Sequence, residues 1–528
     1  MMTIPENWST TSLEELTVHI LGGDWGKSPD YADDLYTDVR CVRAVEVNGW
    51  QQTRGKTAAL RKVKLPSLEK RRLIEGDLII EISGGGPEQP VGRSILIDKI
   101  ALKDENAPPL ICTNFFRQVR PSEHIFSYYL NYFLSFFYQS GEILKFQSGS
   151  NNLRNLKFKE YLTISIPIPP LDEQKRIVIK IEELFSELDK GVENLKKAQA
   201  QLKVYRQALL KYAFEGKLTA DWREINKDKL ESADDLLARI KTEREARFNY
   251  QINDWKKAVF EWEKNGKEGK KLTKPRKLKD VEPLDIDELN LYPKLPASWK
   301  SVKLGELVWS VKDGPHFSPK YSDEGVPFLS GRNIRPDGVN FNSAKFISEE
   351  LHAELSRRCL PEKGDILYTK GGTTGIARVN TYDEIFNVWV HVAVLKITES
   401  LMPFYLQHAL NAPTCFSQSQ KYTHGVGNQD LGLTRMVNII LPLCSEAEQL
   451  EIIQKLDKMS SQLDQMETDI KMQLKKSEAL RRSILKKAFS GELVEQDPND
   501  EPASILLERI KAEKQAQAVP KKTRKKAS

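Results

Sequence analysis

Two glycine-rich segments, each followed by an arginine, have a composition suited to a loop that approaches phosphate groups. Residues 83–86 read Ser-Gly-Gly-Gly and precede Arg93, and residues 371–375 read Gly-Gly-Thr-Thr-Gly and precede Arg378. Glycine lets a backbone come close to a ligand, and arginine supplies charge for phosphate oxygens. Neither segment has the spacing of a dinucleotide-binding or ATP-binding loop. The alternative is an ordinary turn in which glycine supplies positive φ angles.

Further polar segments occur in pairs, one in each half of the chain. Residues 39–43 align with residues 326–330, after which the second half continues to Arg335, and residues 147–155 align with residues 423–431. Arginine pairs with guanine edges and asparagine or glutamine with adenine edges, although the same residue types also serve solvated turns. The candidate DNA contacts are Arg40, Arg43, Ser83, Gly84, Gly85, Arg93, Asn151, Asn152, Arg154, Arg332, Asn333, Arg335, Lys370, Thr373, Thr374, Arg378, Asn428 and Gln429.

No enzyme motif accompanies these segments in the sequence. It contains no Gly-x-x-x-x-Gly-Lys-Ser/Thr phosphate loop, no His-Glu-x-x-His motif and no Asn/Asp-Pro-Pro-aromatic motif of an adenine methyltransferase. The 5 cysteines include no Cys-x-x-Cys pair, which disfavours a zinc ribbon and a disulfide framework and fits a reducing compartment. We therefore expect no catalytic residue, metal site or cofactor in this chain.

The chain contains an internal duplication. Residues 171–174 recur as 446–449 and residues 213–218 recur as 488–493, both at an offset of 275, so this block has a fixed length. Outside the block the offset changes: Trp8 pairs with Trp299 at 291, residues 75–79 with 363–367 at 288, and residues 235–241 with 505–511 at 270. Each copy therefore has a divergent first part, a second part of locked length and a short helical appendix.

The part of locked length is predicted to be one long helix. Its apolar residues recur on a seven-residue period, as in a coiled-coil seam, and Gly216 and Gly491 stand where a helix C-cap belongs. A helix of about 44 residues is about 66 Å long. We expect the two copies to pack on each other; packing on a different protein is the alternative. The predicted seam residues are Ile181, Leu188, Leu195, Leu202, Leu209, Leu456, Leu463, Ile470, Leu480 and Ile484.

The divergent parts are predicted to be mixed α/β domains, because short β-type runs alternate with turns. Expected strands lie at residues 77–82, 94–97 and 388–395, and expected helices at 125–134 and 402–410. The predicted organisation is a first reading domain at residues 1–170, a long helix at 171–216, a helical appendix near 231–245 within a charged linker at 217–296, a second reading domain at 297–442, a second long helix at 443–491, and an appendix with a basic tail at 492–528.

Charge and hydropathy limit the choice of compartment and partners. The net charge of +6 is small, but residues 256–280 hold ten Lys or Arg against four acids, and the tail from Lys511 holds seven against one. Disordered, solvated charge runs explain these stretches best, and polyelectrolyte binding is the alternative. The N-terminus lacks the pattern of a signal peptide, and no apolar stretch is long enough to span a membrane, so we expect a cytoplasmic protein.

The order of domains and the helix boundaries resemble the specificity subunit (HsdS) of type I restriction–modification systems. The resemblance rests on residues 166–177, which read Ile-Pro-Ile-Pro-Pro-Leu-Asp-Glu-Gln-Lys-Arg-Ile, and on residues 208–218 and 484–493 at the helix ends. It covers nearly the whole chain. The second copy departs from the pattern at residues 441–446, which lack the double proline.

This resemblance implies two target recognition domains held by two antiparallel spacer helices. Each domain would read one half of an asymmetric, two-part site in double-stranded DNA, with an adenine methylated in each half. Two HsdM-type methyltransferase subunits and two HsdR-type restriction subunits would be the partners. S-adenosylmethionine, ATP and magnesium would belong to those partners.

Two other functions are alternatives. A coiled-coil scaffold without a nucleic-acid role would not need the clustered arginines, amides and glycines. A single-chain restriction–modification enzyme would need the methyltransferase motifs, which are missing from the sequence.

Overall fold

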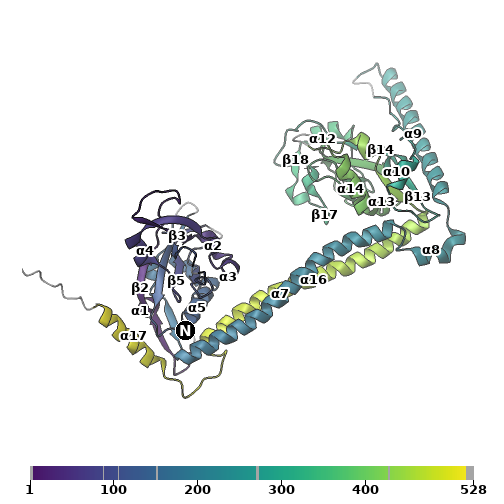
Figure 1. The fold of residues 1–528 in the computed structure, drawn as a ribbon. Coiled ribbons are helices and arrows are strands. Elements are labelled where there is room, and N and C mark those ends of the chain that lie inside the picture. Colours follow the sequence, from purple (N-terminus) through teal and green to yellow (C-terminus); the bar gives the residue numbers. More distant parts are fainter. Residues whose placement is uncertain are drawn as a thin grey trace, which may run out of the picture. The chain divides into compact units, whose positions relative to one another are not determined.

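The computed structural model describes residues 4–86, 89–104, 106–149, 153–268, 273–425 and 429–518. The chain forms two compact units, which are unit 1 (Met1–Lys196 and Lys471–Ser528) and unit 2 (Lys197–Ile470). Each unit contains one mixed α/β domain and part of each of two long helices, α7 (Leu171–Phe214) and α16 (Glu446–Ser490) (Figure 1).

The domain of unit 1 is built on four small sheets and the helix α5 (Ser127–Gln139). The central antiparallel sheet has the order β2 (Thr17–Gly22), β9 (Phe116–Pro121), β5 (Leu78–Glu81), β7 (Ser94–Leu96). A second sheet has the order β4 (Ala59–Lys64), β3 (Tyr36–Val42), β8 (Leu110–Cys112). The others are β10 (Gln147–Ser148), β11 (Arg154–Leu156), β6 (Ser83–Gly85), and the pair β1 (Ser9–Ser12), β12 (Ser165–Ile168).

Three of these four sheets recur in unit 2 with the same strand order, which supports the duplication. Its central sheet has the order β14 (Val308–Asp313), β22 (Val392–Ile397), β19 (Ile366–Thr369), β20 (Ala377–Val379). The second sheet has the order β18 (Lys345–Ile347), β15 (Val326–Leu329), β21 (Asn387–Val388), and β13 (Lys300–Lys303) pairs with β23 (Ile440–Leu443). In both units the middle strand of the second sheet pairs antiparallel on one side and parallel on the other.

One predicted strand was wrong. The apolar run at residues 388–395 was expected to be a single strand, but β21 ends at Val388 and β22 begins at Val392. A turn in which the Val392 amide donates to the Trp389 carbonyl at 2.9 Å separates them. The two strands belong to different sheets, and Val388 and residues 392–395 are buried.

The helices α7 and α16 lie antiparallel in each unit. In unit 1 Arg481 pairs with Asp189, and in unit 2 Arg206 pairs with Asp464 at 2.6 Å. These two ion pairs occupy equivalent positions of the repeat. Gly216 and Gly491 follow the helices with φ angles of +74° and +79°, as expected for C-caps.

The predicted seam residues differ in burial. The structure buries Ile181 and Ile484 in unit 1, and it buries Leu209, Leu456 and Leu463 in unit 2. Leu188, Leu195, Leu202 and Ile470 are half-buried. Leu480 is 49% exposed. The seam instead passes through Leu474, Ser477 and Arg481, because a four-then-three spacing continued from Leu463 reaches these positions and misses residue 480.

A helix from the end of each repeat packs on the neighbouring domain. In unit 2 this is α9 (Ala233–Lys264), and in unit 1 it is α17 (Ala503–Ala518). The appendix predicted near 231–245 is therefore much longer, because α9 continues through residues expected to be linker. A capping box starts α9, in which the Ser232 hydroxyl accepts from the Asp235 amide at 3.1 Å.

The described part of the chain contains no helix long and apolar enough to cross a membrane. Among the same residues, no cluster of three or more His, Cys, Asp or Glu side chains could hold a metal ion.

Candidate nucleic-acid interface

In unit 1 the two polar segments predicted as loops come together in one small sheet. β6 contains the glycine-rich segment and pairs with β11, in which Arg154 lies opposite Gly85 and Asn155 lies opposite Ser83. The Ser83 hydroxyl also donates to the Asn155 amide oxygen at 2.5 Å. The sequence placed these segments separately, and the structure makes them neighbours at the carboxyl end of β5.

In unit 2 the equivalent segments converge in the same way. Gly371 forms an isolated bridge with Asp430, and the Leu431 amide donates to the Lys370 carbonyl at 2.7 Å. The third polar segment joins them, because a Cβ atom at Gly331 would lie 3.0 Å from the carbonyl oxygen of Gly371. Three segments far apart in sequence therefore meet at the carboxyl end of β19.

Several candidate contacts are exposed at these sites, and others serve the fold. Arg332, Arg335, Thr373, Gln429 and Gly84 are exposed, and Arg154, Arg378, Arg40, Ser83 and Gly85 are half-buried. Lys370, Asn333 and Thr374 are buried. Asn151, Asn152 and Asn428 lie outside the described residues. The converging segments therefore present arginine, glutamine, threonine and glycine, while the buried members hold the loops in shape.

Two of the predicted arginines are bound to buried carboxylates. Arg93 makes a two-pronged contact with Glu81 at 2.6 and 2.8 Å, and Arg43 binds Glu46 at 2.6 Å. Although burial opposes its charge, the bond to Glu81 raises the pKa of Arg93. These two guanidinium groups are therefore engaged within the fold.

Asn333 organises a turn in unit 2. Its side-chain oxygen accepts hydrogen bonds from the amide and hydroxyl of Ser330 at 2.8 and 2.9 Å, and its amide group donates to the carbonyl of Asn340 at 2.9 Å. This turn exposes the neighbouring Arg332 and Arg335. Asn333 thereby supports the two arginines without being available itself.

Aromatic side chains at the same sheet end were missed by the sequence reasoning. In unit 1 Trp25 follows β2 and is 38% exposed, and Phe115 precedes β9 and is 47% exposed. The Arg61 guanidinium lies over the Trp25 ring, 4.2 Å from its centroid, and donates to its carbonyl at 3.0 Å. In unit 2 Phe317 follows β14 and is 54% exposed. Only the similar positions of residues 25 and 317, three or four residues after the end of a strand, could have indicated them.

A histidine lies among the converging segments of unit 2. His391 begins the turn into β22 and stacks edge-on against Trp389 with ring centroids 5.0 Å apart. Burial lowers the pKa of His391, and the neighbouring Lys370 ammonium acts in the same direction. Its imidazole is therefore neutral at pH 7 and adds no charge to the interface.

The motif residues that carry the sequence resemblance lock the domains to the helices. In unit 2 Glu448 accepts from Trp299 at 2.8 Å, Thr219 at 2.6 Å and Arg223 at 2.8 Å. In unit 1 Glu173 accepts from Trp8 at 3.0 Å and Gln496 at 2.6 Å. Each tryptophan therefore ties the start of a domain to the start of a long helix.

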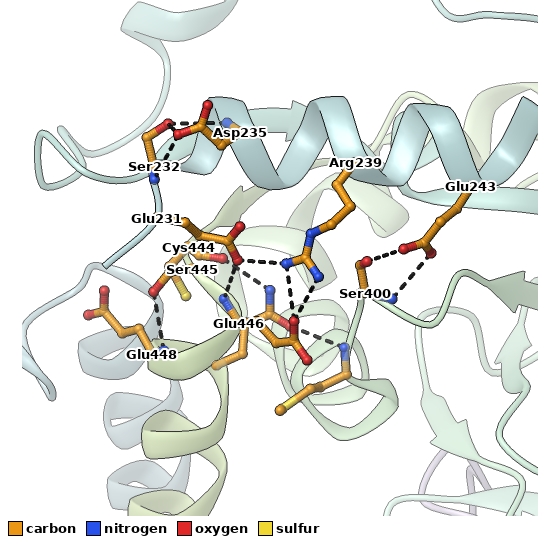
Figure 2. A network of polar contacts seen from close by, with 12 residues as sticks. Glu231, Ser232, Asp235, Arg239, Glu243, Ser400, Cys444, Ser445, Glu446 and Glu448 are labelled. Atoms are coloured by element: carbon orange, nitrogen blue, oxygen red, sulfur yellow. Dashed lines mark hydrogen bonds and ion pairs between the residues drawn. The ribbon is translucent and has the colours of Figure 1, made fainter. Parts of the chain in front are cut away.

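The helix α9 is held at the start of α16 by charged side chains (Figure 2). Arg239 donates to Glu446 at 3.0 Å and to Glu231 at 2.7 Å, and Glu243 accepts from Ser400. In unit 1 the corresponding residues Arg509 and Glu513 bind Glu501 and Ser122. The repeat therefore extends to the attachment of its terminal helices.

Comparison with known sequences gives the family. Residues 5–198 and 296–476 match the family described as "Type I restriction modification DNA specificity domain". The chain belongs to this family and contains two copies of its domain. The EcoKI specificity subunit of Escherichia coli strain K12 is 24% identical over 99% of both chains, and the StySPI specificity subunit of Salmonella potsdam is 25% identical over 99% of both.

Solved structures support the fold. A chain from a study titled "Structural basis underlying complex assembly and conformational transition of the type I R-M system" aligns with a TM-score of 0.59 at 18% identity. The alignment covers 93% of this chain and 100% of the other. The prediction of two recognition domains joined by paired helices is therefore confirmed.

Proposed function

We propose that this chain reads a two-part, asymmetric DNA site as the specificity subunit of a type I restriction–modification complex. The observation that carries the proposal is the convergence, in both units, of a glycine-rich segment with a second polar segment at the same end of the central sheet. Two copies of one architecture with different side chains suit two different half-sites.

The exposed residues at this sheet end suit contacts with DNA. Arg332 and Arg335 can bind guanine edges or phosphates, Gln429 can bind adenine edges, and the glycine at position 84 or 372 permits close approach. Trp25, Phe115 and Phe317 add flat apolar surfaces. In this proposal Arg154 serves the first half-site.

The remaining parts of the complex would carry the chemistry. Two HsdM-type subunits would bind S-adenosylmethionine and methylate an adenine in each half-site, and two HsdR-type subunits would use ATP and magnesium for translocation and cleavage. This chain would supply recognition and a frame, with α7 and α16 setting the spacing between half-sites.

The test is to map methylated bases in cells that express the chain with its modification partner. We expect one bipartite motif with unlike halves separated by a fixed number of unspecified bases. Arg154→Ala should relax only one half, and the double variant Arg332→Ala with Arg335→Ala should relax only the other, so each variant controls for the other. A loss of about 1–3 kcal/mol per base contact corresponds to roughly 5- to 150-fold less discrimination. Unmodified DNA, or a palindromic motif, would contradict the proposal.

A further inference from the structure

A buried lysine fastens the recognition segment of unit 2. Lys370 directly follows β19, and its side chain is 3% exposed. Its ammonium lies 2.8 Å from the Asp430 carboxylate and 3.4 Å from the Asp313 carboxylate. Burial this deep excludes direct contact with DNA, so another role is needed for a charge that is costly to bury.

One of the residues that Lys370 binds, Asp430, is paired with His424 by two backbone hydrogen bonds. The amide of His424 donates to the carbonyl of Asp430 at 3.2 Å, and the amide of Asp430 donates to the carbonyl of His424 at 3.0 Å. Gly425 and Gln429, which lie between these two residues, are exposed. The ion pair therefore holds Asp430, which pairs with His424 and directly follows Gln429.

The second carboxylate connects the loop to the rest of the sheet end. Asp313 ends β14 and also binds Arg358 at 2.8 Å and His316 at 3.2 Å. The backbone of Lys370 completes the frame, because its amide donates to the carbonyl of His391 at 2.9 Å. Lys370 is thus the link between the loop, the strand end of β14 and the turn before β22.

In unit 1 an apolar residue stands in the place of Lys370. The position equivalent to Lys370 is Ile82, whose amide donates to Phe115 and whose carbonyl accepts from Leu156, both at 2.8 Å. The strands β10, β11 and β6 pair there, and Asn155 lies opposite Ser83 as Asp430 lies opposite Gly371 in unit 2. Backbone pairing holds these segments in unit 1, whereas unit 2 has backbone pairing and the buried ion pair.

We propose that Lys370 is a positioning residue for specificity at the second half-site. This inference rests on the proposed function. Without its ammonium, the carboxylates of Asp430 and Asp313 would face each other with less neutralisation, and repulsion would move Asp430 and the adjoining Gln429 out of register. Base contacts depend on such alignment, so recognition would relax in one half of the site only.

The experiment compares Lys370→Met with Lys396→Met. Lys396 lies in the same unit at the opposite end of the central sheet, and it also bridges two carboxylates, Glu362 at 2.5 Å and Asp365 at 2.7 Å. Each variant is expressed as the full chain with its modification partner, and methylated bases are mapped in the cell. We expect Lys370→Met to reduce discrimination at one or more positions of the second half-site by about tenfold or more, while the first half-site stays unchanged. Lys396→Met should keep both halves.

The double variant Lys370→Met with Asp430→Asn separates positioning from stability. It removes one negative charge along with the positive one, so assembly should recover while relaxed recognition of the second half-site persists. If Lys370→Met alone fails to assemble, the motif methylated by the double variant tests the inference instead. An unchanged motif in Lys370→Met and in the double variant, or equal effects of Lys370→Met and Lys396→Met, would overturn the inference. If the unaltered chain gave no bipartite motif, the proposed function itself would fail instead.

Discussion

Lengthening both long helices by one heptad should lengthen the spacer of the DNA site. The insertions are placed after Lys196 in α7 and after Lys471 in α16, which are equivalent positions of the repeat. Asp189 and Arg481 then stay together on one side of the insertions, and Arg206 and Asp464 stay together on the other. Seven residues preserve the phase of the seam because its period is 3.5 residues.

The expected change follows from helix geometry. Seven residues at 1.5 Å each add about 10.5 Å. Since duplex DNA rises about 3.4 Å per base pair, this equals about three base pairs. Three base pairs also turn the duplex by roughly 100°, since about 10.5 base pairs make a full turn. The lengthened chain should therefore accept a longer spacer but bind it more weakly, because part of this twist must be absorbed by the DNA.

The assay is methylated-base mapping in cells, with binding to oligonucleotides of stepped spacer length as a second measurement. We expect the preferred spacer to grow by two to four base pairs while both half-sites keep their sequences. Inserting the heptad in α7 alone is the control, because it breaks the register of one ion pair and should abolish methylation. An unchanged spacer in the doubly lengthened chain would refute the idea that the helices set the distance.

Three further predictions test the frame and the interface. Glu448→Gln should lower the free energy of unfolding by roughly 3 kcal/mol because it leaves the Arg223 charge without its carboxylate. Glu173→Gln should lower it less because the donors to Glu173 are neutral. Equal losses in urea titrations would contradict this prediction. Gly372→Ala and Gly364→Ala both place alanine at a positive φ with open space around it, so each should lower the free energy of unfolding by about 1 kcal/mol. Only Gly372→Ala should weaken methylation through the second half-site. Burial lowers the pKa of His408 from 6.5, so the unfolded state takes up a proton at higher pH than the folded state. The free energy of unfolding should therefore fall as the pH drops through about 6.5. Thermal unfolding measured at stepped pH should show that His408→Gln removes this pH dependence.

The sequence predicted the frame well because the frame follows simple spacing rules. The constant offset of 275 and the heptad seam required only that helix length and apolar period be kept. Leu480 was wrongly assigned to the seam because the seam positions in this stretch are the polar residues Ser477 and Arg481. A search for apolar residues does not find polar seam positions. The extension of α9 was missed because its charged composition is also that of a linker.

The interface was predicted less completely because tertiary contacts decide which polar side chains remain available. Lys370 and Arg93 have the residue type and the loop position of DNA contacts, yet each meets a carboxylate contributed by a different strand or loop. No local pattern reports those partners. Trp25 was missed for the opposite reason, since an exposed tryptophan is indistinguishable in sequence from a buried one.

Unit 1 is assembled from two stretches of chain that leave the ribosome at different times. Its core is closed by Phe489 of α16, which contacts Tyr129, Phe133 and Phe136 of α5. The 274 residues of unit 2 are synthesised in between, which takes roughly 15–55 s at 5–20 residues per second. During translation the aromatic face of α5 stays without its Phe489 contact while the residues of unit 2 are already synthesised. Until Phe489 has emerged, the first recognition domain therefore lacks part of its core, and the second domain is complete in sequence before the first.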